Sequence, residues 1–253
     1  MIAILLAAGY ATRMYTLTTT IPKTLFKVCG RHIIDYICDE IDTIPDIEKI
    51  LLISNAKYFE KHLEWAKDRK ISKTHSTNII VLNDGSETES SKLGAIRDIN
   101  YVIQQEVIND DILVIAGDSF FTYRLFDFYK YFKINNLDCV VVTKEENIEE
   151  LKRGGVVTIT LNNLIVDFEE KPENPKSKLS ACACYIFKKE TLPHFETYLN
   201  NKNNSDAPGY FIEWLYMHNK VLAYHPCGEF YDIGTPEAYE YIKKLFNDFE
   251  RYI

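Results

Sequence analysis

Residues near the N-terminus combine types that can bind polyphosphate. Gly9 and Arg13 lie in a segment rich in small residues, and Lys23 follows it. The segment comes directly after the apolar run of residues 2–6, which has the length of a buried strand. Small residues at the C-terminal edge of a strand let a ligand approach backbone N–H groups, while Arg13 and Lys23 add fixed positive charge. This segment predicts a site for a nucleoside triphosphate.

Other interpretations of this segment are weaker. Turns rich in glycine and alanine are common at strand ends, so Gly9 alone indicates little. It has no glycine partner at the spacing of the dinucleotide fingerprint, and the chain has no Gly-Lys-Ser or Gly-Lys-Thr triplet of a P-loop. The complete string, with Thr12-Arg13 and the later Pro22-Lys23, favours a triphosphate over an ordinary turn.

Two further segments carry charged residues directly after predicted strands. Asp118 follows the buried run of residues 112–116, where a carboxylate is placed to hold a divalent cation such as Mg²⁺. The alternative for Asp118 is a helix cap or a turn. Glu170 and Lys171 end another strand, and in an extended chain they point to opposite faces, so they cannot both be simple salt-bridge partners. The alternative for this pair is an ordinary solvated strand end.

Together these segments resemble the motifs of the nucleoside-diphosphate-sugar pyrophosphorylases, also called sugar-1-phosphate nucleotidylyltransferases. That family opens with Leu-Ala-x-Gly-x-Gly-Thr/Ser-Arg-Leu/Met and a later Pro-Lys, and it closes with Asp-x-Gly-Thr-Pro, which here begins at Asp232. Ala11 replaces the second glycine and tightens the loop near the phosphates, and Ser119 replaces the asparagine of Gly-Asp-Asn. The resemblance covers essentially the whole chain and is closest to the glucose-1-phosphate thymidylyltransferase branch.

The resemblance implies a role for each matched residue. The implied catalytic residues are Arg13, which would stabilise the departing pyrophosphate, Lys23, which would bridge the α-phosphate and the sugar phosphate, and Asp118. The implied Mg²⁺ ligands are Asp118 and Asp232. The implied nucleotide-binding residues are Leu6, Ala7, Ala8, Gly9, Thr12, Asn83 and Gly94. The implied sugar-phosphate-binding residues are Gly155, Glu170 and Lys171.

The implied reaction joins a nucleoside triphosphate to a sugar 1-phosphate and releases pyrophosphate. Asn83 can both donate and accept hydrogen bonds, so it cannot separate thymine from uracil. The branch favours dTTP, with UTP next, and glucose 1-phosphate as the sugar. One alternative is a cytidylyltransferase for phosphocholine, for which 17 Tyr and 14 Phe could supply an aromatic box. Another is a binding protein without activity, which only Ala11 and Ser119 favour.

Composition sets the wider limits. The net charge of −8 over 253 residues argues against a nucleic-acid partner and against a polybasic membrane surface. Six cysteines show no zinc-type spacing, which predicts reduced, buried thiols. The N-terminal apolar run is too short for a signal peptide or a membrane span, so we expect a cytoplasmic protein. Whether it forms a homo-oligomer is left open.

Strand and helix patterns alternate along the first half. Apolar runs predict strands at 50–53, 79–82, 112–116 and 139–143, and helical spacing predicts helices at 32–44, 58–68, 92–105 and 125–133, with an extended piece at 24–28. This order predicts an α/β, Rossmann-like (GT-A-like) fold with a doubly wound, mostly parallel sheet, whose ligands bind at the carboxyl ends of the strands.

The rhythm changes in the second half of the chain. A hairpin is expected from strands at 156–160 and 164–169, then a strand at 181–187, two helices, a short strand pair and a last helix from Thr235. We expect one nucleotidyltransferase domain over 1–253, with a nucleotide-binding half (1–144) and a smaller, β-rich, sugar-binding half (145–253) on the same sheet.

Overall fold

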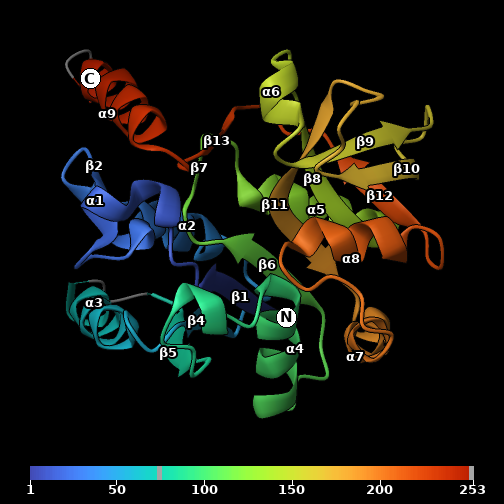
Figure 1. Ribbon diagram of the computed structural model, residues 1–253. Coiled ribbons are helices and arrows are strands. Elements are labelled where there is room, and N and C mark those ends of the chain that lie inside the picture. Colours follow the sequence, from blue (N-terminus) through green and yellow to red (C-terminus); the bar gives the residue numbers. More distant parts are fainter. Residues whose placement is uncertain (73–75, 251–253) are drawn as a thin grey trace.

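A nine-stranded sheet forms the centre of the computed structural model, which describes residues 1–72 and 76–250 (Figure 1). The N-terminal half supplies four neighbouring strands that run parallel. In sheet order these are β5 (Asn78–Asn83), β4 (Lys49–Ser54), β1 (Ile2–Ala7) and β6 (Ile112–Ala116). Their carboxyl ends therefore lie at one edge of the sheet, where such folds bind ligands.

The C-terminal half continues the same sheet. Strand β11 (Leu179–Phe187) pairs antiparallel with β6 and so joins the two halves. The other strands are β8 (Asp138–Lys144), β9 (Gly155–Ile159), β10 (Ile165–Glu170) and β12 (Val221–Tyr224). Strands β9 and β10 form the predicted hairpin. The predicted α/β fold with a large, mostly parallel central sheet is confirmed.

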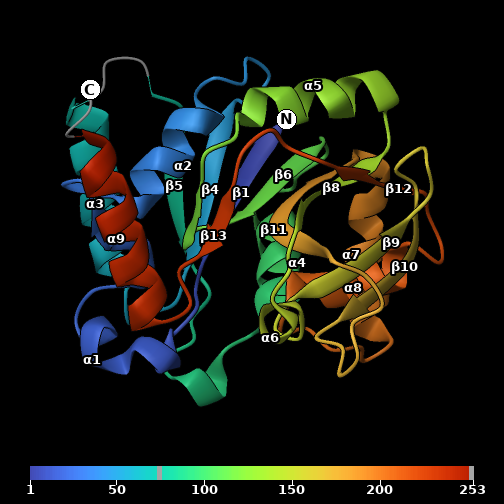
Figure 2. The ribbon, with the colours of Figure 1, turned by 90° about the horizontal axis from the view of Figure 1, so that it is seen from above.

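Helices cover both faces of the sheet (Figure 2). One face packs on α2 (Ile33–Ile41), α3 (Phe59–Ser72) and α5 (Leu125–Asn135), and the other on α4 (Ala95–Gln105), α7 (Leu192–Asn200) and α8 (Pro208–Leu215). In β1, the fully buried Ile4 and Leu5 point to opposite faces and belong to the two separate cores. A strand buried on both sides explains the continuous apolar run in the sequence.

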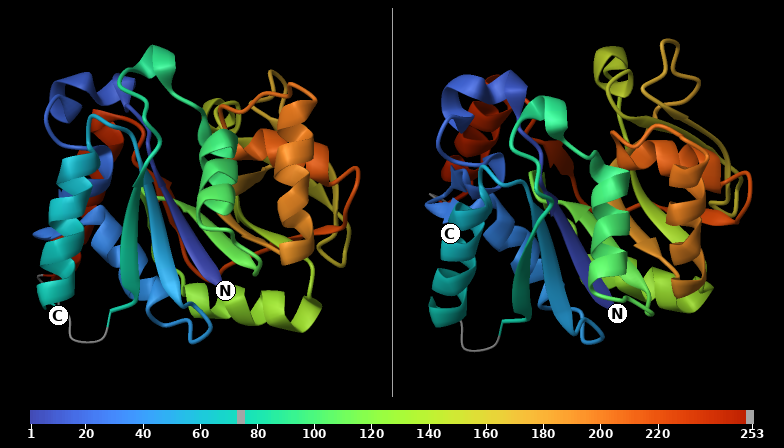
Figure 3. Two further views of the ribbon diagram at one scale, coloured as in Figure 1. Left: turned by 90° about the horizontal axis from the view of Figure 1, so that it is seen from below. Right: turned by 60° about the horizontal axis from the view of Figure 1, so that its bottom comes forward.

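The last helix, α9 (Pro236–Glu250), returns to the N-terminal half of the molecule. It packs on the hairpin of β2 (Lys27–Val28) and β3 (Arg31–His32), where the rings of Phe26 and Tyr239 lie 5.0 Å apart. Figure 3 shows the red helix beside the blue N-terminal segment. Helix α9 therefore packs on residues of the N-terminal half, although it falls within the range expected for the sugar-binding half (145–253).

Several predicted elements are corrected by the structure. The expected pair of late strands does not form, because β12 pairs with β8, and β13 (Phe230–Asp232) pairs with β7 (Ser119–Phe121). The predicted helix at 92–105 begins at Ala95, because Gly94 has a φ of 90°. The extended piece at 24–28 starts instead with the 3₁₀ turn η2 (Lys23–Leu25). The short helices α1 (Tyr15–Thr18) and α6 (Ile148–Leu151) had no expected counterpart.

The thiol prediction holds for four of the six cysteines. Cys38, Cys139, Cys182 and Cys184 are buried. Cys29 is partly exposed and Cys227 is exposed, because both lie in turns rather than in strands or core helices. Within the described ranges, no helix has both the length and the apolar character needed to cross a bilayer.

A buried arginine fastens α3 to α2. The Arg69 side chain is 3% exposed, and its guanidinium lies 2.8 Å from both Asp39 and Asp42 and 3.4 Å from Asp35. Removing one partner of a buried ion pair leaves charges that neither water nor another group fully compensates. We expect Arg69→Ala to lower the free energy of unfolding by about 3 kcal/mol. Urea denaturation checks this, with the exposed Arg97→Ala as the matched control. Equal stability of the two variants would contradict the expectation.

Candidate active site

The loop after β1 is held in place by a buried asparagine. Asn55, which follows β4, donates from Nδ2 to the Ala8 carbonyl at 2.9 Å and accepts from the Tyr58 N–H at 3.0 Å. Farther along this loop, Ala11 has a φ of 49°, in the left-handed region where glycine has no steric penalty. A glycine would adopt this conformation without strain, whereas Ala11 adopts it with a side chain.

Lys23 is placed by a chain of buried hydrogen bonds. Its neighbour Thr24 bonds through Oγ1 to Nε2 of His62 at 2.8 Å, and His62 Nδ1 bonds to Ser54 Oγ at 2.8 Å. Burial lowers the pKa of His62 to about 4, so the ring is neutral at pH 7 and links η2 to the end of β4. The backbone of Arg13 lies in the 3₁₀ turn η1 (Thr12–Met14), but its side chain lies outside the described part of the structure.

Asp118 lies next to Lys23, and the two side chains form an ion pair. The segment after β6 is fixed because the Gly117 N–H donates to the Leu6 carbonyl at 2.9 Å. A Cβ on Gly117 would lie 3.1 Å from that carbonyl oxygen, a contact tighter than most Cβ atoms make, so glycine fits this close approach best. The structure thus brings together the lysine and the aspartate that the sequence placed 95 positions apart (118 − 23).

A two-stranded sheet brings Asp232 to the cavity that Asp118 lines. Strand β13 pairs antiparallel with β7, and this register sets Asp232 opposite Ser119, the residue after Asp118. Both aspartates line one cavity. Among the described residues, no group of three or more His, Cys, Asp or Glu side chains forms a metal cluster. Two carboxylates at an open cavity fit Mg²⁺, which takes one or two carboxylates and completes its shell with phosphate oxygens and waters.

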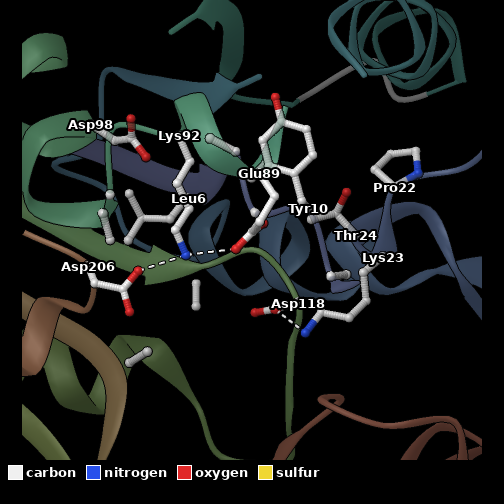
Figure 4. Close-up of a pocket in the computed structure, with 18 of the residues that line it drawn as sticks. Leu6, Tyr10, Pro22, Lys23, Thr24, Glu89, Lys92, Asp98, Asp118 and Asp206 are labelled. Atoms are coloured by element: carbon white, nitrogen blue, oxygen red, sulfur yellow. Dashed lines mark ion pairs between the residues drawn. The ribbon is translucent and has the colours of Figure 1, made fainter. Parts of the chain in front are cut away.

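Two adjoining cavities, of about 400 and 470 Å³, share Asp118 in their lining. The first is bounded by the loop after β1 and by the N-terminus of α4 (Figure 4). The predicted nucleotide-binding residues that line it are Leu6, Ala7, Ala8, Gly9, Thr12 and Gly94. Asn83 does not line it; its amide oxygen accepts from the Gly85 N–H at 2.9 Å, at the start of the following turn.

Charged residues that the sequence did not single out also line the first cavity. Lys92 Nζ lies 2.9 Å from both Glu89 and Asp206, so it links the loop before α4 to the loop before α8 (Figure 4). A backbone hydrogen bond joins the same two loops, because the Ala95 N–H donates to the Asp206 carbonyl at 3.2 Å. Tyr10 and Asp98 also line this cavity without having been predicted. No spacing rule marks these residues, since they meet through contacts between distant loops.

The second cavity contains all three residues predicted to bind the sugar phosphate, Gly155, Glu170 and Lys171. A Cβ on Gly209 would lie 1.8 Å from Glu170 Oε2, so the carboxyl packs directly on the backbone at the start of α8. Burial raises the pKa of Glu170 to about 7, with Lys171 opposing the rise. The opposite-face geometry predicted for Glu170 and Lys171 is wrong, because the chain turns at Lys171, where φ is 53°.

Comparison with known proteins agrees with this arrangement. The Nucleotidyl transferase family matches residues 2–248. A glucose-1-phosphate adenylyltransferase of Lachnospira eligens is 28% identical over 247 residues, covering 94% of this chain and 58% of the relative. The bifunctional protein GlmU of Methanocaldococcus jannaschii is 29% identical over 250 residues, covering 97% of this chain and 55% of that protein. The chain therefore spans somewhat more than half the length of these curated relatives.

A solved structure supports the fold independently. UDP-glucose pyrophosphorylase complexed with UDP-glucose superimposes with a TM-score of 0.82 over 98% of both chains, at 18% identity. At that identity the likeness concerns the fold alone. The family match covers nearly the whole chain, and its motifs converge on the two cavities that share Asp118. The chain belongs to the Nucleotidyl transferase family.

Proposed function

We propose that this protein transfers the nucleotidyl group of a nucleoside triphosphate to a sugar 1-phosphate and releases pyrophosphate. The observation that carries the proposal is the Lys23–Asp118 pair, because Asp118 belongs to both cavities and Lys23 lies beside it. A triphosphate in the first cavity and a sugar phosphate in the second would meet at this pair. The sequence motifs favour dTTP, then UTP, and glucose 1-phosphate.

The chemistry needs little beyond positioning and charge neutralisation. An oxygen of the sugar phosphate attacks the α-phosphorus, the bond to the pyrophosphate oxygen breaks, and no side-chain nucleophile is required because the attacking phosphate is already anionic. Lys23 would bind the α-phosphate and the incoming phosphate, and Arg13 the leaving pyrophosphate. Asp118 and Asp232 would hold Mg²⁺, which supplies positive charge to the phosphates when bound.

Glu170 would bind sugar hydroxyls, and its ionisation predicts a pH effect. A carboxylate accepts stronger hydrogen bonds than a neutral acid, and Glu170 ionises as the pH rises through about 7. We expect the KM for glucose 1-phosphate to fall by about three- to tenfold between pH 6 and 8, since a charged acceptor contributes about 1 kcal/mol more. Steady-state kinetics test this.

The matched control for this pH effect is Glu170→Gln, which cannot ionise. Its KM should keep only the change that comes from the sugar phosphate's own ionisation, near a pKa of about 6. If the KM for glucose 1-phosphate changes with pH equally in the wild type and in Glu170→Gln, the ionisation of Glu170 does not cause the effect.

The lining of the second cavity is also compatible with phosphocholine as the substrate. Tyr185, Phe230, Tyr231 and Tyr241 contribute to its lining, and faces of aromatic rings attract quaternary ammonium groups. The partly buried Glu170 beside Lys171 matches the hydroxyls and phosphate of a sugar phosphate better. A cytidylyltransferase acting on phosphocholine is therefore the second candidate.

A substrate panel distinguishes these reactions. Pyrophosphate release would be measured with Mg²⁺ and dTTP, UTP, CTP, GTP or ATP, each with glucose 1-phosphate and, in parallel, with phosphocholine. We expect dTTP with glucose 1-phosphate to give the fastest release. Release from CTP with phosphocholine alone would replace the proposal by the second candidate. Another triphosphate with glucose 1-phosphate would keep the reaction and change the base.

A further inference from the structure

Asp98 is a buried carboxyl in the wall of the first cavity. It lies one helical turn after Gly94, in the first turns of α4, and it is 6% exposed while still lining the cavity. Neither the sequence motifs nor the predicted roles account for it. Carboxyl groups are rarely this buried without partners, so the position needs a reason.

The Asp98 carboxyl lacks a hydrogen-bond partner for Oδ1 among the described residues. An unsatisfied buried oxygen is costly, more so when the group is charged, unless a ligand completes its hydrogen bonds. Burial raises the pKa of Asp98 to about 8, and the charge of Asp84 adds to the rise. The carboxyl is therefore mostly protonated at neutral pH, and it presents one donor and one acceptor side by side.

The position of Asp98 identifies the part of a nucleotide that would reach it. Figure 4 shows Asp98 on one side of the cavity and the Lys23–Asp118 pair on the other, with Leu6 between them. A triphosphate held at Lys23 and Asp118 would therefore extend its base toward Asp98. Leu6 and Ala95 provide apolar surface on that side. Asn83 does not line the cavity, so among the predicted nucleotide-binding residues that do line it none contributes a polar side chain except Thr12.

We propose that the Asp98 carboxyl hydrogen-bonds the edge of the nucleobase and is a specificity-determining residue of the nucleotide site. A base with a donor next to an acceptor matches it, as in the imide of thymine or uracil. The N3–H would donate to the carboxyl C=O, and the carboxyl O–H would donate to the base O4. This inference rests on the proposed nucleotide site, and it names the residue that reads the base.

Direct binding separates this role from a structural one. Isothermal titration calorimetry with Mg²⁺ would compare dTTP and tripolyphosphate, which has the phosphates but no base, on wild type, Asp98→Ala and Asp98→Asn. We expect Asp98→Ala to weaken dTTP binding about ten- to a hundredfold, the loss of two neutral hydrogen bonds, without changing tripolyphosphate binding. The amide of Asp98→Asn keeps a donor and an acceptor, so it should bind dTTP within about threefold of wild type. Asp127→Asn, an exposed carboxylate on α5 that does not line the cavity, is the matched control.

Three outcomes would overturn the inference. These are unchanged dTTP binding in Asp98→Ala, an equal loss for dTTP and tripolyphosphate, and an Asp98→Asn variant as weak as Asp98→Ala while melting at the wild-type temperature. Turnover is measured separately. A base-dependent loss in Asp98→Ala without wild-type turnover would support the inference and reject the proposed reaction.

Discussion

Lys23→Ala is expected to lower kcat about 10²–10³-fold, the range lost when one group that stabilises transition-state charge is removed. Lys23 is mostly buried, at 12% side-chain exposure; it lines the first cavity, and its ammonium pairs with Asp118, which lines both cavities. Lys92 and Lys171, which also line these cavities, pair with Asp206 instead of Asp118. The loss should appear mainly in kcat, because the charge to be neutralised is greatest in the transition state.

The matched control is Lys27→Ala, which removes the same charge four residues away. Lys27 is exposed in β2, and only its backbone bonds to Tyr239. Pre-steady-state and steady-state rates with dTTP and glucose 1-phosphate should be normal for this control. Near-normal kcat in Lys23→Ala would mean that another group neutralises the phosphates, and the assignment of Lys23 would be withdrawn.

Asp118→Asn should cause a loss of similar size, about 10²–10³ in kcat. The amide keeps the shape of the side chain but loses the charge that would hold Mg²⁺, so activity should also require higher Mg²⁺ concentrations. Asp127→Asn, an exposed carboxylate on α5, is the charge-matched control. A titration of rate against Mg²⁺ for the three proteins checks both effects. An unchanged Mg²⁺ requirement in Asp118→Asn would contradict the metal role.

The ion pair adds a test of coupling between the two residues. Lys23 and Asp118 form an ion pair with each other. Because the residues are in contact, their effects should not be additive. We expect the double variant Lys23→Ala/Asp118→Asn to be less impaired than the product of the two single losses. Full additivity would indicate that the two residues act independently.

Sequence reasoning worked where one local pattern determines one local structure. The apolar run at 112–116 predicted β6 with its observed bounds, since a strand buried on both faces needs continuous apolar residues. The same logic placed Asp118 at the carboxyl end of β6 and Glu170 at the end of β10. Because β1 and β6 pair in parallel, the loop after β1 lies at the same edge of the sheet as Asp118.

Sequence reasoning was less successful where distant loops meet. Asp206 and Lys92 form an ion pair because the segment before α4 lies beside the loop before α8. Hydrophobic periodicity does not predict a contact of this kind. Asn83 was expected at the nucleotide site, but it is the last residue of β5, and its amide oxygen accepts a hydrogen bond from the turn that follows. The pairing of β13 with β7 was also missed, because three-residue strands are too short to show a period.

The most direct test of the proposed reaction follows the two ends of the triphosphate. The protein would be incubated with Mg²⁺, glucose 1-phosphate and dTTP labelled with ³²P at either the α- or the γ-position. Our account predicts that α-label appears in a nucleoside diphosphate sugar and γ-label in pyrophosphate, with both absent in Lys23→Ala at matched times. Release of γ-label as inorganic phosphate, with the α-label left in dTDP, would show hydrolysis and contradict nucleotidyl transfer.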